Sequence, residues 1–168
     1  ITSRKIKYNY HEAPVSVLEG VFARGDRRLA DVLLKAHEKG IRFDFGEIES
    51  SDLRKNLEGC SSAFIFAATS GSAVDRLIVK QAKISAAYGM ITDSIASSGI
   101  EVFCDLINDE MKKGRRLKPR YSPGYGDVSL NCQSDILSFL DAYRKIGLTL
   151  TETYLMTPIK SVTAIVGI

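Results

Sequence analysis

The chain has 168 residues, which favours one domain (1–168) that can bury roughly 70% of the surface its unfolded form exposes. A net charge of +3 is too small to indicate a nucleic acid or a membrane as partner. Cys60, Cys104 and Cys132 form no Cys-x-x-Cys pair, so neither a zinc site nor a disulfide framework is predicted, and a reduced, cytoplasmic compartment is expected. We expect no signal peptide, and no apolar run of the sequence approaches the roughly 20 residues that span a bilayer.

The first third of the chain predicts a strand, a helix and a second strand. Basic and apolar residues alternate over residues 4–10, which indicates a short strand. Asp26 is a good N-cap for a helix from Arg27 to Lys39, and Gly40 is a natural end for it. Residues 41–46 alternate again and predict a short strand.

The middle of the chain predicts one buried strand between helices. Ser51 or Asp52 can cap a brief helix that runs to Leu57. The apolar run 62–68 is short and bounded by turn residues, as in a buried strand. Residues 72–113 have helical periodicity, in one or two pieces. Within them the small residues 96–99 allow a close approach by another backbone or a ligand.

The last third predicts a helix and two strands. The helix covers residues 133–146, with an inner face of Ile136, Leu137, Leu140 and Tyr143. Residues 148–155 and 161–166 read as strands, and their short connection predicts an antiparallel hairpin. We therefore expect an α+β fold, with helices packed on a mainly antiparallel, twisted sheet.

The loop from Arg120 to Gly126 carries the strongest candidate for a binding site. Pro123 fixes its own φ, and Gly124 allows backbone shapes that other residues resist, so the loop is shaped by its sequence. Arg120 offers a planar guanidinium suited to a carboxylate or phosphate, and Tyr125 offers an aromatic face suited to a base or a cation. S-adenosylmethionine carries a carboxylate, a base and a permanent cation together. The alternative is an ordinary turn between two elements.

Other chemistries find little support. The basic run from Lys112 to Arg120 is typical of a solvated loop, and its limited aromatic interleaving gives only weak support to nucleic-acid binding. His11 and His37 have no evident nucleophile beside them, so no hydrolase and no catalytic residue is predicted.

Several blocks taken in order resemble a known family. From residue 48 the chain is similar to the activation domain of cobalamin-dependent methionine synthase, and more closely to the small stand-alone bacterial proteins of that type. The matching blocks are Asp52–Cys60, Ala67–Gly71, Val74–Ile78, Ile100–Asp105, Pro119–Asp127, Leu140–Asp141, Leu150–Pro158 and Lys160–Val162.

The resemblance implies a site and a role. Arg120 would hold the carboxylate of S-adenosylmethionine, the backbone around Ser122 and Gly124 would meet the adenine, and Tyr125 would help shape the pocket. Glu101 would approach the charged end of the ligand. The family docks on a corrinoid-binding methionine synthase or methyltransferase and supplies a methyl group when the cobalamin carried by that partner has been oxidised. A flavoprotein or similar donor provides the electron, so the protein itself contributes position and electrostatics.

Two departures from the family pattern define an alternative. Residues 1–47 resemble instead a segment of corrinoid-binding radical S-adenosylmethionine proteins, without the cysteine triad of an iron–sulfur cluster. The family's larger domain also continues past the position of Val162 to a tyrosine that contacts the ligand. The alternative is a non-catalytic partner that docks on a corrinoid protein and no longer binds S-adenosylmethionine.

Overall fold

The computed structural model describes residues 32–33, 35–36, 41–43, 45–112 and 114–168. The described elements are helices and small antiparallel sheets, as expected for an α+β protein. In chain order they are β1 (Val32–Leu33), β2 (Lys35–Ala36), β3 (Ile41–Phe43), β4 (Gly46–Ile48), α2 (Ser51–Asn56), β5 (Ser62–Thr69), α3 (Ser72–Ile84), α4 (Ala86–Lys112), α5 (Cys132–Leu140), α6 (Ala142–Ile146), β6 (Thr149–Leu150), β7 (Met156–Thr157) and β8 (Ser161–Gly167).

The centre of the molecule is the antiparallel pair of β5 and β8. Ile65 lies opposite Ile165, and the pairing extends from Ala63 with Gly167 to Thr69 with Ser161. β1 pairs with the other edge of β5, giving the order β1-β5-β8. The buried strand predicted at 62–68 is thereby confirmed as β5.

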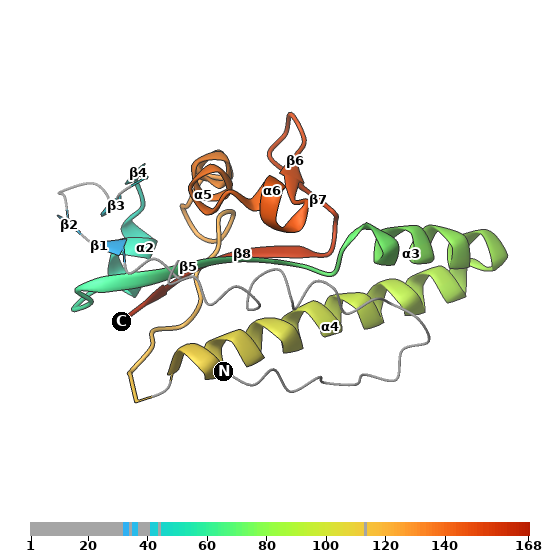
Figure 1. The fold of residues 1–168 in the computed structure, drawn as a ribbon, viewed down its shortest axis with the longest axis horizontal. Coiled ribbons are helices and arrows are strands. Elements are labelled where there is room, and N and C mark those ends of the chain that lie inside the picture. The colour runs from blue at the N-terminus through green and yellow to red at the C-terminus, as the bar shows by residue number, and fades with distance from the viewer. Residues whose placement is uncertain (1–31, 34, 37–40, 44, 113) are drawn as a thin grey trace.

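Helices cover both faces of this pair, which is why β5 is apolar at consecutive positions (Figure 1). Successive side chains of a strand point to opposite faces. Phe64 and Phe66 pack with Ile107 of α4 on one face. Ile65 packs with Leu53 of α2 and with residues of α5 on the other. Both layers depend on the same short strand.

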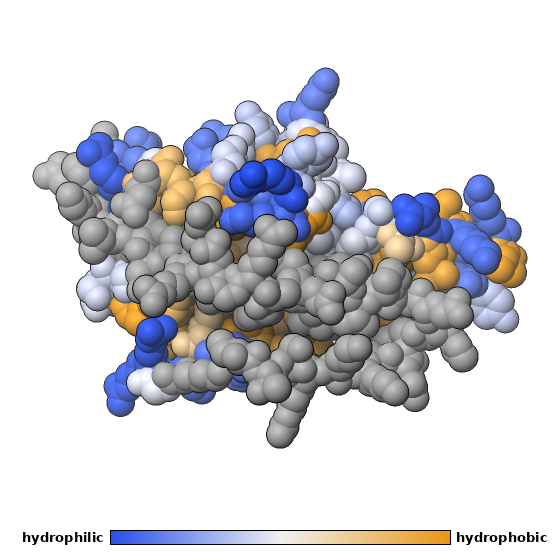
Figure 2. Space-filling model, viewed as in Figure 1, coloured by the Kyte–Doolittle hydropathy of each residue, from blue (hydrophilic) through white to orange (hydrophobic). Residues whose placement is uncertain are grey.

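The long helical region divides into two antiparallel helices at Ser85, whose φ of −158° and ψ of 138° are extended. α3 has no buried residue, and together with the first half of α4 it extends beyond the sheet (Figure 1). A Cβ added at Gly89 would lie 2.7 Å from the Cβ of Ala82, so the two helices approach closely there. Some hydrophobic side chains of this pair, such as those of Val79 and Ile91, stay exposed, and hydrophobic residues are visible at that end of the surface (Figure 2). None of the described helices has the length and apolarity needed to cross a bilayer.

The small residues 96–99 allow a close approach, and at Gly99 no described atom makes one. An added Cβ at Gly99 would meet no atom within 4 Å, and residues 98 and 99 are exposed. The close contact between the two helices lies nearer the start of α4, at Gly89. The spacing of small residues on a helix does not determine which side another helix covers.

The helix predicted from Arg27 to Lys39 is wrong in its described part. Val32–Leu33 pairs with β5, and Lys35–Ala36 pairs with β3. Unpaired edges of these strands offer backbone hydrogen bonds that outweigh a weak helical preference. The strand predicted at 41–46 is divided between β3 and β4, which pair as a hairpin. The strand predicted at 4–10 lies outside the described residues, as does most of the segment that resembles radical S-adenosylmethionine proteins.

The C-terminal strands differ from the prediction. β6 ends at Leu150, and residues 151–155 form a loop in which Tyr154 has a φ of 61°. The hydroxyl of Thr151 accepts a hydrogen bond from the backbone N–H of Leu155 at 3.1 Å, a local bond that competes with strand pairing. β6 pairs with β7, and β8 pairs with β5, so the predicted hairpin of 148–155 with 161–166 is wrong.

The predicted helix 133–146 is interrupted at Asp141, which has a left-handed φ of 54°. This break turns α6 away from the axis of α5. Ile136 and Leu137 are buried as expected, whereas Tyr143 is 73% exposed and does not belong to the inner face.

Candidate functional site

The segment from Lys118 to Tyr121 runs along the free edge of β8. The backbone N–H of Lys118 donates to the carbonyl of Gly167 at 2.9 Å, and Tyr121 exchanges two backbone hydrogen bonds with Ile165, at 2.9 and 2.8 Å. An extended segment directs neighbouring side chains to opposite faces. Arg120 therefore reaches the face covered by α4, and Tyr121 packs against the core cluster on the other face.

The rest of the loop is tightly built, as its sequence predicted. Pro123 is buried, and Gly124 has a φ of 90°, which favours glycine. The backbone N–H of Gly124 donates to the carbonyl of Val128 at 2.9 Å, and that of Val128 donates to the carbonyl of Tyr125 at 3.0 Å. These bonds fix the loop without help from a ligand.

Asp127 joins the end of this loop to the start of α2. Its carboxylate accepts hydrogen bonds from the hydroxyls of Ser50 and Ser51 and from the backbone N–H groups of Ser51, at 2.8 Å, and Asp52, at 3.2 Å. The hydroxyl bonds, and then the backbone N–H bonds, lower the pKa of Asp127 well below its usual range, because each favours the ionised form. A Cβ at Gly126, whose φ is 53°, would lie too close to the side-chain ends of Asp52 and Tyr121, so both would have to shift for any other residue.

Arg120 lies under two carboxylates of α4. Its Nη1 donates to Oδ1 of Asp105 at 2.7 Å, and its Nη2 donates to Oε2 of Glu101 at 3.1 Å. The Arg120 side chain is 20% exposed, whereas those of Glu101 and Asp105 are 61% and 68% exposed. The cation is thus largely covered, and the two acids face solvent.

A second cation, Lys160, contacts the same side of α4 as Arg120. Nζ of Lys160 lies 2.8 Å from Oδ1 of Asp93 and donates to Oγ of Ser97 at 2.9 Å. Asp93, Ser97, Glu101 and Asp105 recur every four residues and so lie along one side of the helix. Lys160 directly precedes β8, and Arg120 lies on the segment along its edge, so the two cations contact successive parts of this side of α4.

The structure brings together two of the five predicted site residues. Arg120 and Glu101 are in contact. Ser122, Gly124 and Tyr125 belong to the part of the loop that leads toward α2, and the hydrogen bonds and ion pairs described for Arg120 go to Glu101 and Asp105 and not to these three residues. Tyr125 is 68% exposed. Asp105 and Lys160 were not predicted as site residues. The four-residue spacing from Glu101 could have indicated Asp105, whereas nothing local indicates Lys160.

The basic run beside the loop is partly engaged by the fold. The guanidinium of Arg115 lies 5.4 Å from the centre of the Phe64 ring, a cation–π distance. Arg120 is paired with acids, as described above. These two cations therefore contribute to packing, while Lys112 and Arg116 are exposed.

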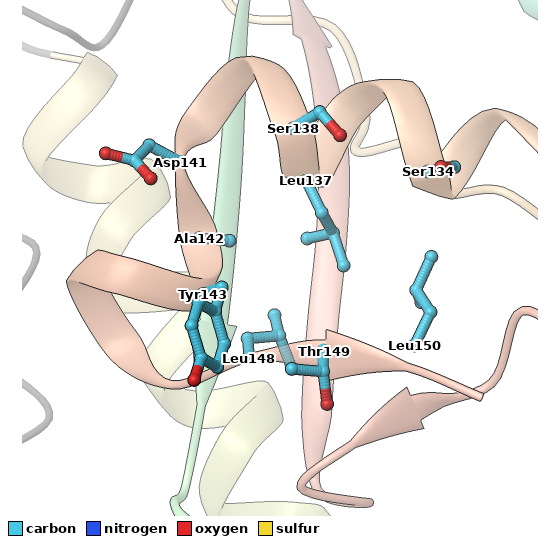
Figure 3. Close-up of a pocket in the computed structure, with 9 residues that line it drawn as sticks. All are labelled: Ser134, Leu137, Ser138, Asp141, Ala142, Tyr143, Leu148, Thr149 and Leu150. Carbon is cyan, nitrogen blue, oxygen red and sulfur yellow. The ribbon is translucent and has the colours of Figure 1, made fainter.

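A separate hollow of about 320 Å³ lies where α5, α6 and β6 meet (Figure 3). Leu137 and Leu148 point into it, while the carboxylate of Asp141 is turned away and pairs with Arg144 (Figure 3). None of the five predicted site residues lines this hollow. Glu152, expected to face water or a pocket, is exposed on the loop between β6 and β7.

Comparison with models of known protein families and with curated proteins finds no match for this chain.

Proposed function

We propose that this protein is a cytoplasmic S-adenosylmethionine-binding module that supports the reductive methylation of a corrinoid cofactor on a methionine synthase or related methyltransferase. The proposal includes the finer fold, that of the methionine synthase activation domain. It rests on the ordered sequence blocks named above and on the contact between Arg120 and Glu101.

The contact between Arg120 and Glu101 is the observation that carries the proposal. The two residues lie 19 positions apart in the sequence, and the family resemblance assigns both to the amino-acid end of the same small ligand. A guanidinium has five N–H donors, and the bonds to Glu101 and Asp105 use two of them. Donors therefore remain for a ligand carboxylate without breaking either ion pair.

The residues present fit the amino-acid end of S-adenosylmethionine. Arg120 is positioned by the pairing of Tyr121 with β8, so its guanidinium is oriented before a ligand arrives, which lowers the entropic cost of binding. When bound, S-adenosylmethionine supplies the methyl group, which leaves its sulfonium as the equivalent of a methyl cation. In this proposal Arg120 binds the carboxylate of the ligand, and Glu101 pairs with its positively charged end. The exposed ring of Tyr125 lies on the same loop as Arg120.

The alternative function, a docking partner that no longer binds S-adenosylmethionine, is favoured by one observation. Both terminal nitrogens of Arg120 already have a carboxylate partner. In this alternative the ion pairs serve only to hold α4 against the segment beside β8.

Isothermal titration calorimetry separates these functions. We expect the protein to bind S-adenosylmethionine and Arg120→Ala to lose at least about tenfold in affinity, since hydrogen bonds to charged groups contribute about 1.5–3 kcal/mol. Arg116→Ala is the matched control, because Arg116 is an exposed arginine of the same basic run. No binding at millimolar ligand, with both variants behaving like the parent, contradicts the proposal.

Docking is tested with a purified corrinoid-binding domain of methionine synthase. Pull-down in the presence and absence of S-adenosylmethionine is expected to show capture that the ligand strengthens. Capture that is indifferent to the ligand supports the alternative.

A further inference from the structure

We infer that Asp105, acting with Glu101, makes this site select the positively charged sulfonium ligand over the neutral thioether that remains after the methyl group has left. The inference rests on the proposed function and adds a specificity-determining residue to it. The observation behind it is that two acids, rather than one, converge on Arg120.

The geometry separates the two acids by one helical turn. Glu101 and Asp105 stand four residues apart on α4, and each approaches a different terminal nitrogen of the same guanidinium. The shorter contact, 2.7 Å, belongs to Asp105. Both carboxylates are more than half exposed, so a ligand that reaches Arg120 from solvent passes beside them.

The charges of this group do not balance. One guanidinium faces two carboxylates, which leaves one net negative charge. S-adenosylmethionine, with a carboxylate, an ammonium group and a sulfonium, has one net positive charge, whereas S-adenosylhomocysteine has none. One acid can balance Arg120 or the ammonium group, and the second is then left for the sulfonium.

The neighbouring ion pair on the same helix lacks this excess. Lys160 meets the single carboxylate of Asp93, with the neutral hydroxyl of Ser97 beside it. Of the two cations described on this side of α4, only Arg120 contacts two carboxylates. Asp93 therefore provides an internal control, since it offers the same carboxylate on the same side of the same helix.

The test compares two ligands on three proteins. Calorimetry measures the dissociation constants of S-adenosylmethionine and S-adenosylhomocysteine for the parent, Asp105→Asn and Asp93→Asn at low ionic strength. We expect the parent to prefer S-adenosylmethionine, and Asp105→Asn to reduce that preference by about two- to fivefold, the range of an exposed ion pair. Asp93→Asn is expected to leave the preference unchanged.

A second measurement does not depend on substitutions. Attraction between exposed charges weakens as salt is added, so the parent's preference is expected to decline between about 0.01 and 0.15 M ionic strength. Thermal melts confirm that each variant is folded before it is titrated.

The outcomes distinguish failure of the proposed function from failure of the role inferred for Asp105. If the parent binds neither ligand, the proposed function fails and this inference falls with it. If the parent binds both ligands but Asp105→Asn keeps the full preference, or Asp93→Asn loses as much, the inference is overturned while the proposed function stands.

Discussion

Asp127 is exposed, yet its carboxylate accepts hydrogen bonds from two hydroxyls and two backbone N–H groups at the start of α2. All of these bonds are stronger to the ionised form. A carboxyl group whose pKa is lowered in the folded state adds stability above its unfolded pKa, near 3.8, and loses that contribution as the pH falls through the folded value.

We therefore expect Asp127→Asn to lower the melting temperature at pH 7, and the difference from the parent to shrink below about pH 4. Thermal melts followed by circular dichroism between pH 7 and pH 2 measure this gap. Asp109→Asn, at an exposed position of α4, is the control and is expected to show little difference at any pH. A gap for Asp127→Asn that stays constant down to pH 2 would show that hydrogen bonding to the ionised group is not its cause.

For single residues, the sequence predicts those features that depend only on the local backbone conformation. The shape of the loop follows from Pro123 and Gly124, and the structure confirms that the loop is fixed. The partners of Arg120 depend on packing between segments 15 and 19 positions apart, so only Glu101 was named, through the resemblance. Asp105 can be identified as a second partner of Arg120 only when the packing of α4 against the segment beside β8 is known.

Helix α4 contains two glycines in opposite environments. Gly89 is buried against Ala82, whereas an added Cβ at Gly99 meets nothing within 4 Å. In a helix interior glycine costs about 0.5–1 kcal/mol relative to alanine, and close contact can reverse the sign of that difference.

The same substitution is therefore expected to act in opposite directions on one helix. Gly99→Ala should raise the free energy of unfolding by about 0.5–1 kcal/mol, and Gly89→Ala should lower it, because its methyl group would lie 2.7 Å from the Cβ of Ala82. Urea unfolding curves compare the two variants with the parent. Stabilisation by both would mean that α3 does not pack at Gly89.

The elements that the sequence predicts well are those whose pattern has one reading. Residues 63–68 are all apolar because helices cover both faces of β5, and a short buried strand fits the length of this run. Residues 148–155 alternate in the same way as a strand, but the Thr151 hydroxyl satisfies a backbone N–H locally and the chain turns. Val32 and Leu33 belong to a stretch whose apolar residues recur with helical spacing, but they pair with β5. That pairing becomes possible only when the sheet has formed.

Viewed as a whole, the molecule has a cysteine in each of the two layers beside the sheet. Cys104 lies between α4 and the sheet, and Cys132 lies in the cluster formed with α2 and α5. Burial raises the pKa of Cys104 to about 12 and that of Cys132 to about 11. Since the thiolate is the reactive form, both thiols should be inert while both layers are packed.

Alkylation with iodoacetamide at pH 8 is expected to modify Cys60, which is half-buried, and to leave the other two until the protein unfolds. Peptide mass spectrometry of native and urea-treated samples identifies the modified residues. Cys60→Ser provides the control, because its native form should take up almost no label. Rapid native labelling of Cys104 would contradict the packing of α4 on the sheet.

Helical and strand periods along the sequence predict a mixture of helices and strands, but they do not predict the strand order. β8 was expected to pair with its nearest neighbour in sequence and pairs instead with β5. A hydrophobic strand fits against any partner of suitable length. The choice depends on which pairing lets α4 and α5 cover both faces at once, and no local pattern contains that information.

The pairing of Ile65 with Ile165 has a kinetic consequence. Bringing these strands together closes a loop of about 100 residues, at an entropic cost of about 4 kcal/mol before any long-range contact repays it. The hairpin of α3 and α4 needs only neighbouring residues and can assemble earlier. The pairing of β8 with β5 should therefore be a slow step of folding. Until it occurs, the phenylalanines of β5 stay exposed and can contact other unfolded chains. Refolding yield should therefore fall as protein concentration rises.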